Sequence, residues 1–100
     1  MRKIIDNKLY DTDKCLLICE FKTKVQHPLA SGMSYYPYHY AKIYKTLSGS
    51  FLKYIGKACV DEYSNYEKLE LITIDEVKKI MIEIDAIDEY IKLFGELEEG

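Results

Sequence analysis

The sequence predicts an α+β domain in which an antiparallel sheet of about five strands carries one long C-terminal helix on one face. Short aromatic or β-branched segments, separated by polar and glycine-containing turns, fill most of the first seventy positions. Residues 73–94 then repeat apolar side chains at spacings of three and four. With 100 residues, 48% of them hydrophobic and 31% charged, the chain is expected to fold as one domain over residues 1–100.

The N-terminal segments predict a tight hairpin followed by a strand. Residues 4–5 and 9–10 are apolar and flank Asp6-Asn7, a pair that tolerates the positive φ angles of a two-residue turn. Residues 14–22 follow a polar break as a short apolar run that ends in alternation, which favours a strand over a helix. The middle of this run, Leu16 to Cys19, is expected in the centre of the sheet.

A long loop and a second hairpin come next. Residues 23–37 contain both prolines and a Ser-Gly pair, so a loop is expected around Pro28 to Ser34. Residues 38–45 and 50–57 are aromatic and β-branched, and the turn between them ends in Gly49. A loop of three or of four residues fits this pattern. The four-residue loop places Ile43 opposite Leu52 and Ala41 opposite Tyr54, but it also places Lys42 against Lys53.

Residues 58–67 have no regular pattern, and residues 68–72 predict a last strand that leads into the helix. Thr73 and Glu76 match a capping box, and Gly95 stands where helices commonly end. One apolar stripe of this helix is expected on the sheet. A second set lies about 140° away around the helix, and it comprises Ile82, Ala86, Tyr90, Leu93 and Leu97. This second set needs its own cover, which is another part of the chain, a second copy in a homodimer, or a foreign protein.

Charge and hydropathy narrow the classes of partner and compartment. The net charge of −3 lowers the expectation of general nucleic-acid binding, since such proteins draw affinity from basic residues. No apolar run approaches the roughly 20 residues that span a bilayer, and the N-terminal segment lacks the apolar core of a signal peptide. A cytoplasmic protein without membrane contact is therefore expected. Its three cysteines are expected to remain thiols.

Candidate catalytic and metal-binding residues are few. His27 and His39, together with the three cysteines, could furnish a zinc site or a thiol–imidazole pair. However, Cys15 and Cys19 would lie about 13 Å apart on one strand face, too far to chelate one ion. Asp11 and Asp13 flank a turn, where Asp bonds its own backbone. Because no glycine-rich phosphate loop is present either, we expect no enzyme, no metal and no cofactor.

The abundance of tyrosine points to an interface. The chain has ten tyrosines and no tryptophan, and tyrosine offers a large contact area with little rotamer entropy to lose. Tyrosines could instead simply pack on the sheet, or the Tyr/Lys-rich hairpin could bind single-stranded nucleic acid. The candidate partner-binding residues are Tyr35, Tyr36, Tyr38, Tyr40, Ile82, Ala86, Tyr90 and Leu93.

Three strings, KLYDTDKCLLI, IYKTLSGSFLKYIGKA and LITIDEVKKI, resemble a family of small proteins from Gram-positive bacteria, their phages and mobile elements. Members carry a K-x-Y-D-T-[DE] opening, an L-Y-[RK]-T-K-x-G-x-[FY]-F-L hairpin and a P-L-T-x-E-E-A helix entry. The chain departs from the family after the hairpin, where Gly56-Lys57-Ala58-Cys59 replaces a Gly-Glu-Gly-Gly run. These motifs specify a fold more than a function, and the resemblance implies a mobile-element setting.

The sequence thus favours a non-enzymatic protein-binding module. In the setting that the resemblance implies, this would be a phage or mobile-element inhibitor, of the anti-CRISPR type, that occludes the surface of a bacterial defence complex such as a CRISPR–Cas effector. The alternative is a small nuclease or single-stranded nucleic-acid-binding protein that uses His27, His39 and the Tyr/Lys-rich hairpin.

Overall fold

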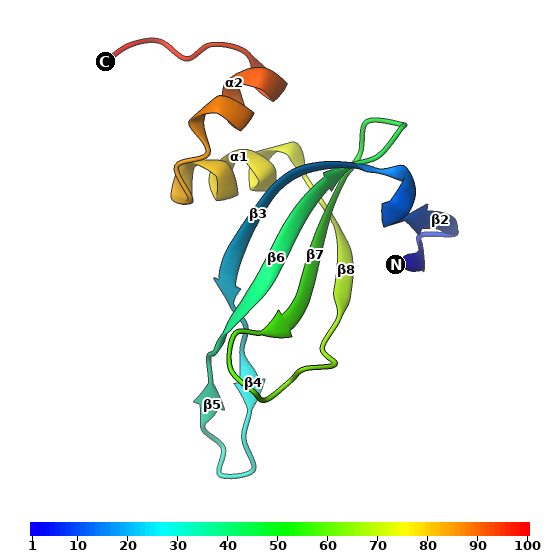
Figure 1. The fold of residues 1–100 in the computed structure, drawn as a ribbon, viewed down its shortest axis with the longest axis vertical. Coiled ribbons are helices and arrows are strands. Elements are labelled where there is room, and N and C mark those ends of the chain that lie inside the picture. The colour runs from blue at the N-terminus through cyan, green and yellow to red at the C-terminus, as the bar shows by residue number, and fades with distance from the viewer.

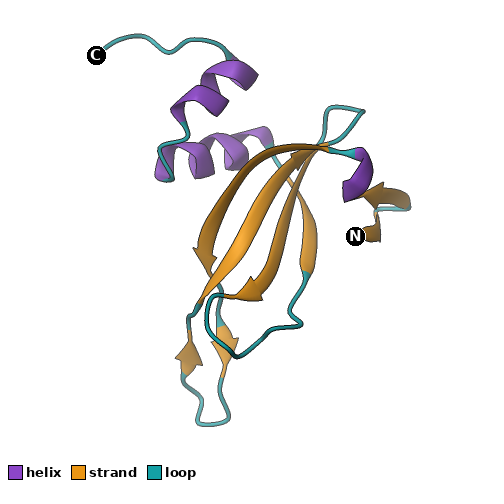
Figure 2. Cartoon of the chain, in the orientation of Figure 1, coloured by secondary structure: helices purple, strands orange, loops and turns teal.

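The computed structural model describes residues 1–100 as an α+β fold built on a four-stranded antiparallel sheet. The strand order is β3 (Leu16–Lys24), β6 (Tyr38–Lys45), β7 (Phe51–Ala58) and β8 (Lys68–Ile72). Two helices, α1 (Ile74–Glu83) and α2 (Ile87–Phe94), lie at one end of the sheet (Figures 1 and 2). The α+β class and the antiparallel sheet are confirmed.

Two small ribbons complete the fold in place of a fifth sheet strand. The predicted N-terminal hairpin is β1 (Arg2–Ile5) and β2 (Lys8–Asp11), with positive φ at Asp6 and Asn7. It lies beside β8 (Figure 1), where the Lys3 ammonium donates to the Leu69 carbonyl at 2.9 Å. The second ribbon is β4 (His27–Pro28) paired with β5 (Ser34–Tyr35). It falls within the stretch predicted as a loop and projects from the end of the sheet opposite the helices (Figure 1).

The hairpin of β6 and β7 has the three-residue loop. The Thr46 amide donates to the Ser50 carbonyl at 2.8 Å, and Gly49 takes a φ of 89°. This register places Tyr44 opposite Leu52 and Ile43 opposite Lys53. It keeps Lys42 away from Lys53 because Lys42 now faces Tyr54. A bulge near Gly56 shifts the pairing by one residue, so that His39 lies opposite Ala58.

The expectation that Leu16 to Cys19 lies in the centre of the sheet is wrong, because β3 is an edge strand. Leu16 and Leu17 are exposed, and the pairing with β6 is irregular between Leu17 and Cys19. Ile18 and Cys19 both pack against the core as a result. The apolar run therefore reflects contact with the helical layer and not burial on both sides of a strand.

The core cluster that joins the two layers lies between the sheet and the helices, while the fully buried Leu52 and Leu69 lie on the other face of the sheet. Ile43, Phe51 and Ile72 of the sheet pack against Val77 and Met81 of α1. The predicted cap of α1 is confirmed: the Thr73 hydroxyl accepts a hydrogen bond from the Glu76 amide at 3.1 Å and donates one to the Glu76 carboxylate at 3.2 Å.

The prediction of a single long helix is wrong, because the chain turns between α1 and α2. Asp85 has a φ of 56°, the Ala86 amide donates to the Met81 carbonyl at 2.9 Å, and the Asp85 amide donates to the Ile82 carbonyl at 3.3 Å. This pair of bonds is a Schellman motif with Asp85 in the left-handed position that glycine usually takes. The break rotates Ala86, Tyr90 and Leu93 toward the core, while Ile82 remains 65% exposed.

Candidate partner-binding surface

A buried histidine pair joins the projecting ribbon to the sheet. His27 opens β4 and His39 lies on β6, and their Nε2 atoms are 2.9 Å apart. Nδ1 of His39 lies 2.7 Å from the Gly56 carbonyl oxygen. A carbonyl only accepts, so Nδ1 of His39 carries a proton and Nε2 of the neutral ring is an acceptor. Nε2 of His27 must then donate to Nε2 of His39, and Nδ1 of the neutral His27 ring carries no proton.

Two tyrosines from the irregular segment 59–67 cover this pair. The Tyr63 ring stacks on His27 with centroids 3.7 Å apart and an interplanar angle of 11°. The Tyr66 ring meets His39 edge-on at 4.7 Å. Burial lowers the pKa of His27, and the neighbouring His39 lowers it further. Sequence reasoning treated the histidines as candidate catalytic or metal-binding residues and missed these tyrosines, whose segment has no periodicity to place them.

The ribbon anchored in this way exposes apolar side chains at its tip. The tip, defined here as residues 29–33, is closed by the Leu29 amide donating to the Met33 carbonyl at 2.8 Å. Met33 is 70% exposed and Leu29 45%, and Tyr36, which follows β5 at the base of the ribbon, is 54% exposed. At the base of the ribbon, the Gln26 amide nitrogen lies 2.9 Å from the Ser34 hydroxyl. The tip is thus an exposed apolar patch on an ordered turn.

The predicted tyrosines fall on two adjoining surfaces. Tyr35 and Tyr36 belong to the ribbon and its exit, and Tyr35 stacks on Tyr63 at a centroid distance of 6.4 Å. Tyr38 and Tyr40 project from β6 on the sheet face that turns away from the helices. The Lys24 ammonium lies 5.4 Å from the centroid of the Tyr38 ring, and the Lys22 ammonium lies 5.6 Å from that of Tyr40. All four tyrosines are partly exposed.

The four predicted helix residues do not join the tyrosines. Ala86, Tyr90 and Leu93 pack partly against the core at the opposite end of the sheet, and the Tyr90 ring contacts Phe94 edge-on. Only Ile82 of these four is exposed. Although the helix breaks at Asp85, a small apolar groove of about 140 Å³ at the break is still lined by four residues of the second apolar set, Ile82, Ala86, Tyr90 and Leu97.

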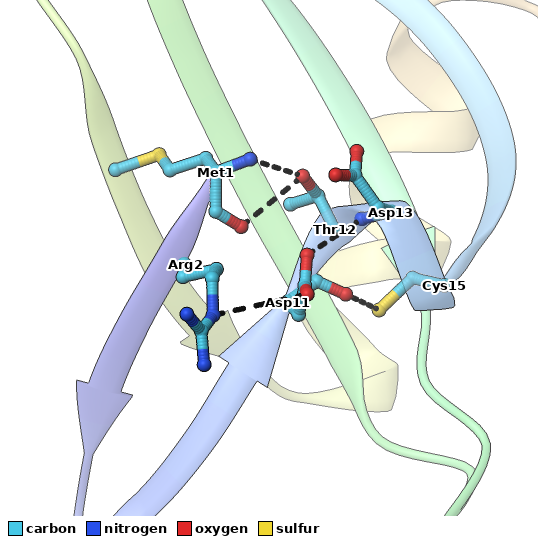
Figure 3. A network of polar contacts seen from close by, with 6 residues as sticks. All are labelled: Met1, Arg2, Asp11, Thr12, Asp13 and Cys15. Carbon is cyan, nitrogen blue, oxygen red and sulfur yellow. Dashed lines mark hydrogen bonds and ion pairs between the residues drawn. The ribbon is translucent and has the colours of Figure 1, made fainter.

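The carboxylates and thiols in the first third of the chain have structural contacts. Asp11 accepts a hydrogen bond from the Asp13 amide at 3.0 Å and caps the short 3₁₀ turn that follows (Figure 3). The Cys15 thiol donates to the Asp11 carbonyl at 3.3 Å. Burial raises the pKa of Cys19 to about 11, with Glu89 adding to the effect against a hydrogen bond to the Ile43 backbone. These features support the turn-chemistry interpretation of Asp11 and Asp13.

No family model, curated protein or solved structure matches the chain. Neither helix is long and apolar enough to cross a bilayer. Nowhere do three His, Cys, Asp or Glu side chains gather as a metal-binding group would require. The geometry of the residues themselves therefore carries the functional interpretation that follows.

Proposed function

We propose that the chain is a non-enzymatic protein-binding module that contacts its partner through the tip of the β4–β5 ribbon. The observation that carries this proposal is the exposure of Met33 and Leu29 on a turn that projects from the sheet, with Tyr36 exposed at the base of the same ribbon. Apolar and aromatic anchors of this kind supply much of the binding energy of protein interfaces. Such side chains gain little binding energy from a purely ionic ligand.

The way the ribbon is held supports a binding role. The histidine pair and the stacked Tyr63 tie the first residue of the ribbon to the sheet. A binding loop that is ordered before association loses less conformational entropy when its partner arrives. The Nε2 atoms of the two histidines form a hydrogen bond with each other, and this bond holds the start of the ribbon against β6.

The resemblance to phage and mobile-element proteins gives the proposal its setting. We place the partner in a bacterial defence complex of the CRISPR–Cas type, whose surface the tip and the adjoining tyrosines would occlude. Such an inhibitor needs affinity and shape and no chemistry of its own, which agrees with the anchors described above. The proposal makes no use of the homodimer that the sequence left open as one cover for the second apolar set, because three members of that set, Ala86, Tyr90 and Leu93, already pack partly against the chain's own core.

A defence assay in the host tests this function. Cells that carry the defence system are challenged with phage while they express the native chain, Met33→Asp or the control Leu47→Asp. Leu47 is 93% exposed in the turn between β6 and β7, at the other end of the sheet. We expect protection of the phage to be lost with Met33→Asp and retained with Leu47→Asp, because only the first places a charge in the interface.

Equal protection by both variants would show that the tip is not the interface. No protection by the native chain in cells with an active defence system would remove the proposed setting. Because both substitutions are at exposed sites, thermal unfolding should show both variants within about 0.5 kcal/mol of the native chain.

A further inference from the structure

The sheet face opposite the helices is basic and aromatic near the ribbon. Cross-strand pairs place Lys22 beside Tyr40 and Lys24 beside Tyr38, while core residues such as Ile43 point to the other face. We call this surface the open face, and its residues are Glu20, Lys22, Lys24, Tyr38, Tyr40, Lys42, Tyr54 and Lys57.

Positive charge on the open face is mostly unpaired. The Lys42 ammonium lies 3.6 Å from the Glu20 carboxylate, whereas Lys22, Lys24 and Lys57 form no ion pair. Two exposed carboxylates, Glu20 and Glu67, lie at this surface and are engaged with Lys42 and Tyr54, whereas the largest acidic group lies elsewhere, on α2 and the C-terminal segment, at Asp88, Glu89, Glu96, Glu98 and Glu99. The net charge of −3 therefore conceals a local surface that attracts anions.

Each exposed tyrosine of β6 has a lysine over its ring. The ammonium groups of Lys22 and Lys57 lie 5.6 and 6.0 Å from the Tyr40 centroid, and that of Lys24 lies 5.4 Å from the Tyr38 centroid. These lysines have long flexible stems, so they can move to a phosphate and free the ring face. A ring with an ammonium at its side offers both contacts that a nucleotide needs, stacking for the base and charge for the phosphate.

A groove of about 750 Å³ runs along this surface. Tyr40 and Lys22 line one part of it, and Tyr66 and Ser64 close it from the segment between β7 and β8. Tyr54 lies on its wall, with its hydroxyl donating to the Glu67 carboxylate at 3.0 Å. An antiparallel sheet with helices on one face and aromatic residues on the central strands of the other is an arrangement on which single-stranded bases stack.

We infer that the open face binds a short segment of single-stranded nucleic acid, with Tyr38 and Tyr40 stacking on bases and Lys22, Lys24 and Lys57 contacting phosphates. An acidic peptide would satisfy the lysines but would leave the rings without flat partners. This surface adjoins the tip proposed above for a protein partner but uses different side chains, so the two proposals stand or fall separately.

Fluorescence anisotropy with labelled oligothymidine and oligouridine of about 12 nucleotides tests this inference at about 50 mM salt. Binding should be saturable and should weaken with salt. The triple variant Lys22→Gln/Lys24→Gln/Lys57→Gln should reduce the log–log salt slope by about 2, at roughly 0.7 for each phosphate contact on a single strand. Lys79→Gln, a change of an exposed lysine on α1, is the matched control and should leave the slope of the native chain within error.

The aromatic contribution is tested by Tyr38→Leu and Tyr40→Leu, each expected to weaken binding by about 5-fold or more. An abasic oligonucleotide of equal length should bind more weakly than oligothymidine, and polyglutamate should compete poorly. Leu47→Asp should bind as the native chain does, because Leu47 lies in the exposed β6–β7 turn and outside the open face. Absent binding, equal affinity for the abasic strand, or effective competition by polyglutamate would overturn the inference, the last in favour of an acidic protein ligand.

Discussion

The histidine pair shows how a few atoms fix the protonation of a buried site. The Gly56 carbonyl sets the tautomer of His39, and His39 in turn sets that of His27. Both rings are almost completely buried, at 9% and 0% exposure, and no buried side-chain nitrogen or oxygen lacks a partner. In the neutral pair one Nε2 donates and the other accepts, so both are paired without a buried charge. The ribbon depends on this arrangement because His27 is its first residue.

A pH dependence of stability follows from the pair. The pKa of His27 in the folded chain lies below its ordinary value of 6.5. Below that value the unfolded chain binds more protons than the folded chain does, so the free energy of unfolding must fall as the pH drops. We expect thermal unfolding to show full stability above about pH 6.5 and progressive loss below it. His27→Asn, which keeps a donor toward His39 but does not titrate, should flatten this dependence.

Long-range ¹H–¹⁵N correlation spectra of the histidines supply the control. They should show the proton of His39 on Nδ1 and that of His27 on Nε2 at neutral pH. An unfolding profile of His27→Asn that loses stability with falling pH as steeply as the native profile would place the titrating group elsewhere.

The helical layer shows that apolar periodicity can predict helical residues correctly and still assign their side chains to the wrong faces. The apolar spacing of three and four continues across Asp85, so periodicity alone predicts one helix over residues 73–94. A Schellman motif ends α1 there instead. Glycine would have signalled the stop, but aspartate tolerates the left-handed conformation and gives a weaker signal. The second apolar set was real as a pattern, and the turn directs most of it inward.

Paired substitutions test this turn. Leu93→Asp should lower the free energy of unfolding by about 2–4 kcal/mol, because Leu93 packs against the core. Ile82→Asp should change it by about 0.5 kcal/mol or less, since Ile82 is exposed. Chemical denaturation measures both values. In a single continuous helix the two residues would share one face, and equal losses would therefore contradict the observed break.

Other elements follow from local chemistry that is visible in the sequence. Asp6-Asn7 and Gly49 supply the positive φ angles of the two hairpins, and Thr73 caps α1. The position of β3 at the sheet edge was not predicted, because its apolar run packs against the helical layer and resembles a strand buried on both faces. The β4–β5 ribbon was not predicted either, because its strands are two residues long and its anchor, the contacts of His27 with His39 and Tyr63, joins residues far apart in the sequence.

The molecule as a whole is thin and extended for its length. Its dimensions are 47 × 38 × 20 Å, and its radius of gyration of 15.2 Å exceeds the roughly 13 Å usual for 100 residues. The projecting ribbon and the outlying helices account for this shape (Figure 1). They also separate the surfaces: apolar side chains at the ribbon tip, lysine and tyrosine on the open face, and acidic groups around α2.

The candidate site could be predicted in part. Tyrosine abundance pointed to Tyr35, Tyr36, Tyr38 and Tyr40, and the structure gathers them at one end of the sheet with partial exposure. The tip residues were not predicted, because Leu29 and Met33 stand in a segment without periodicity. The net charge of the chain did not predict the basic open face, because it sums this face with the acidic groups around α2.

Site-specific photo-cross-linking reports the proposed contact at the ribbon tip. A photoreactive amino acid is placed at Met33 or, as the control, at Leu47, and each tagged chain is irradiated in living host cells. We predict a discrete covalent adduct with one protein from Met33, and none from Leu47, because the tip contacts the partner and the β6–β7 turn lies at the far end of the sheet. The same adduct from both positions, or from Leu47 alone, would contradict binding through the tip.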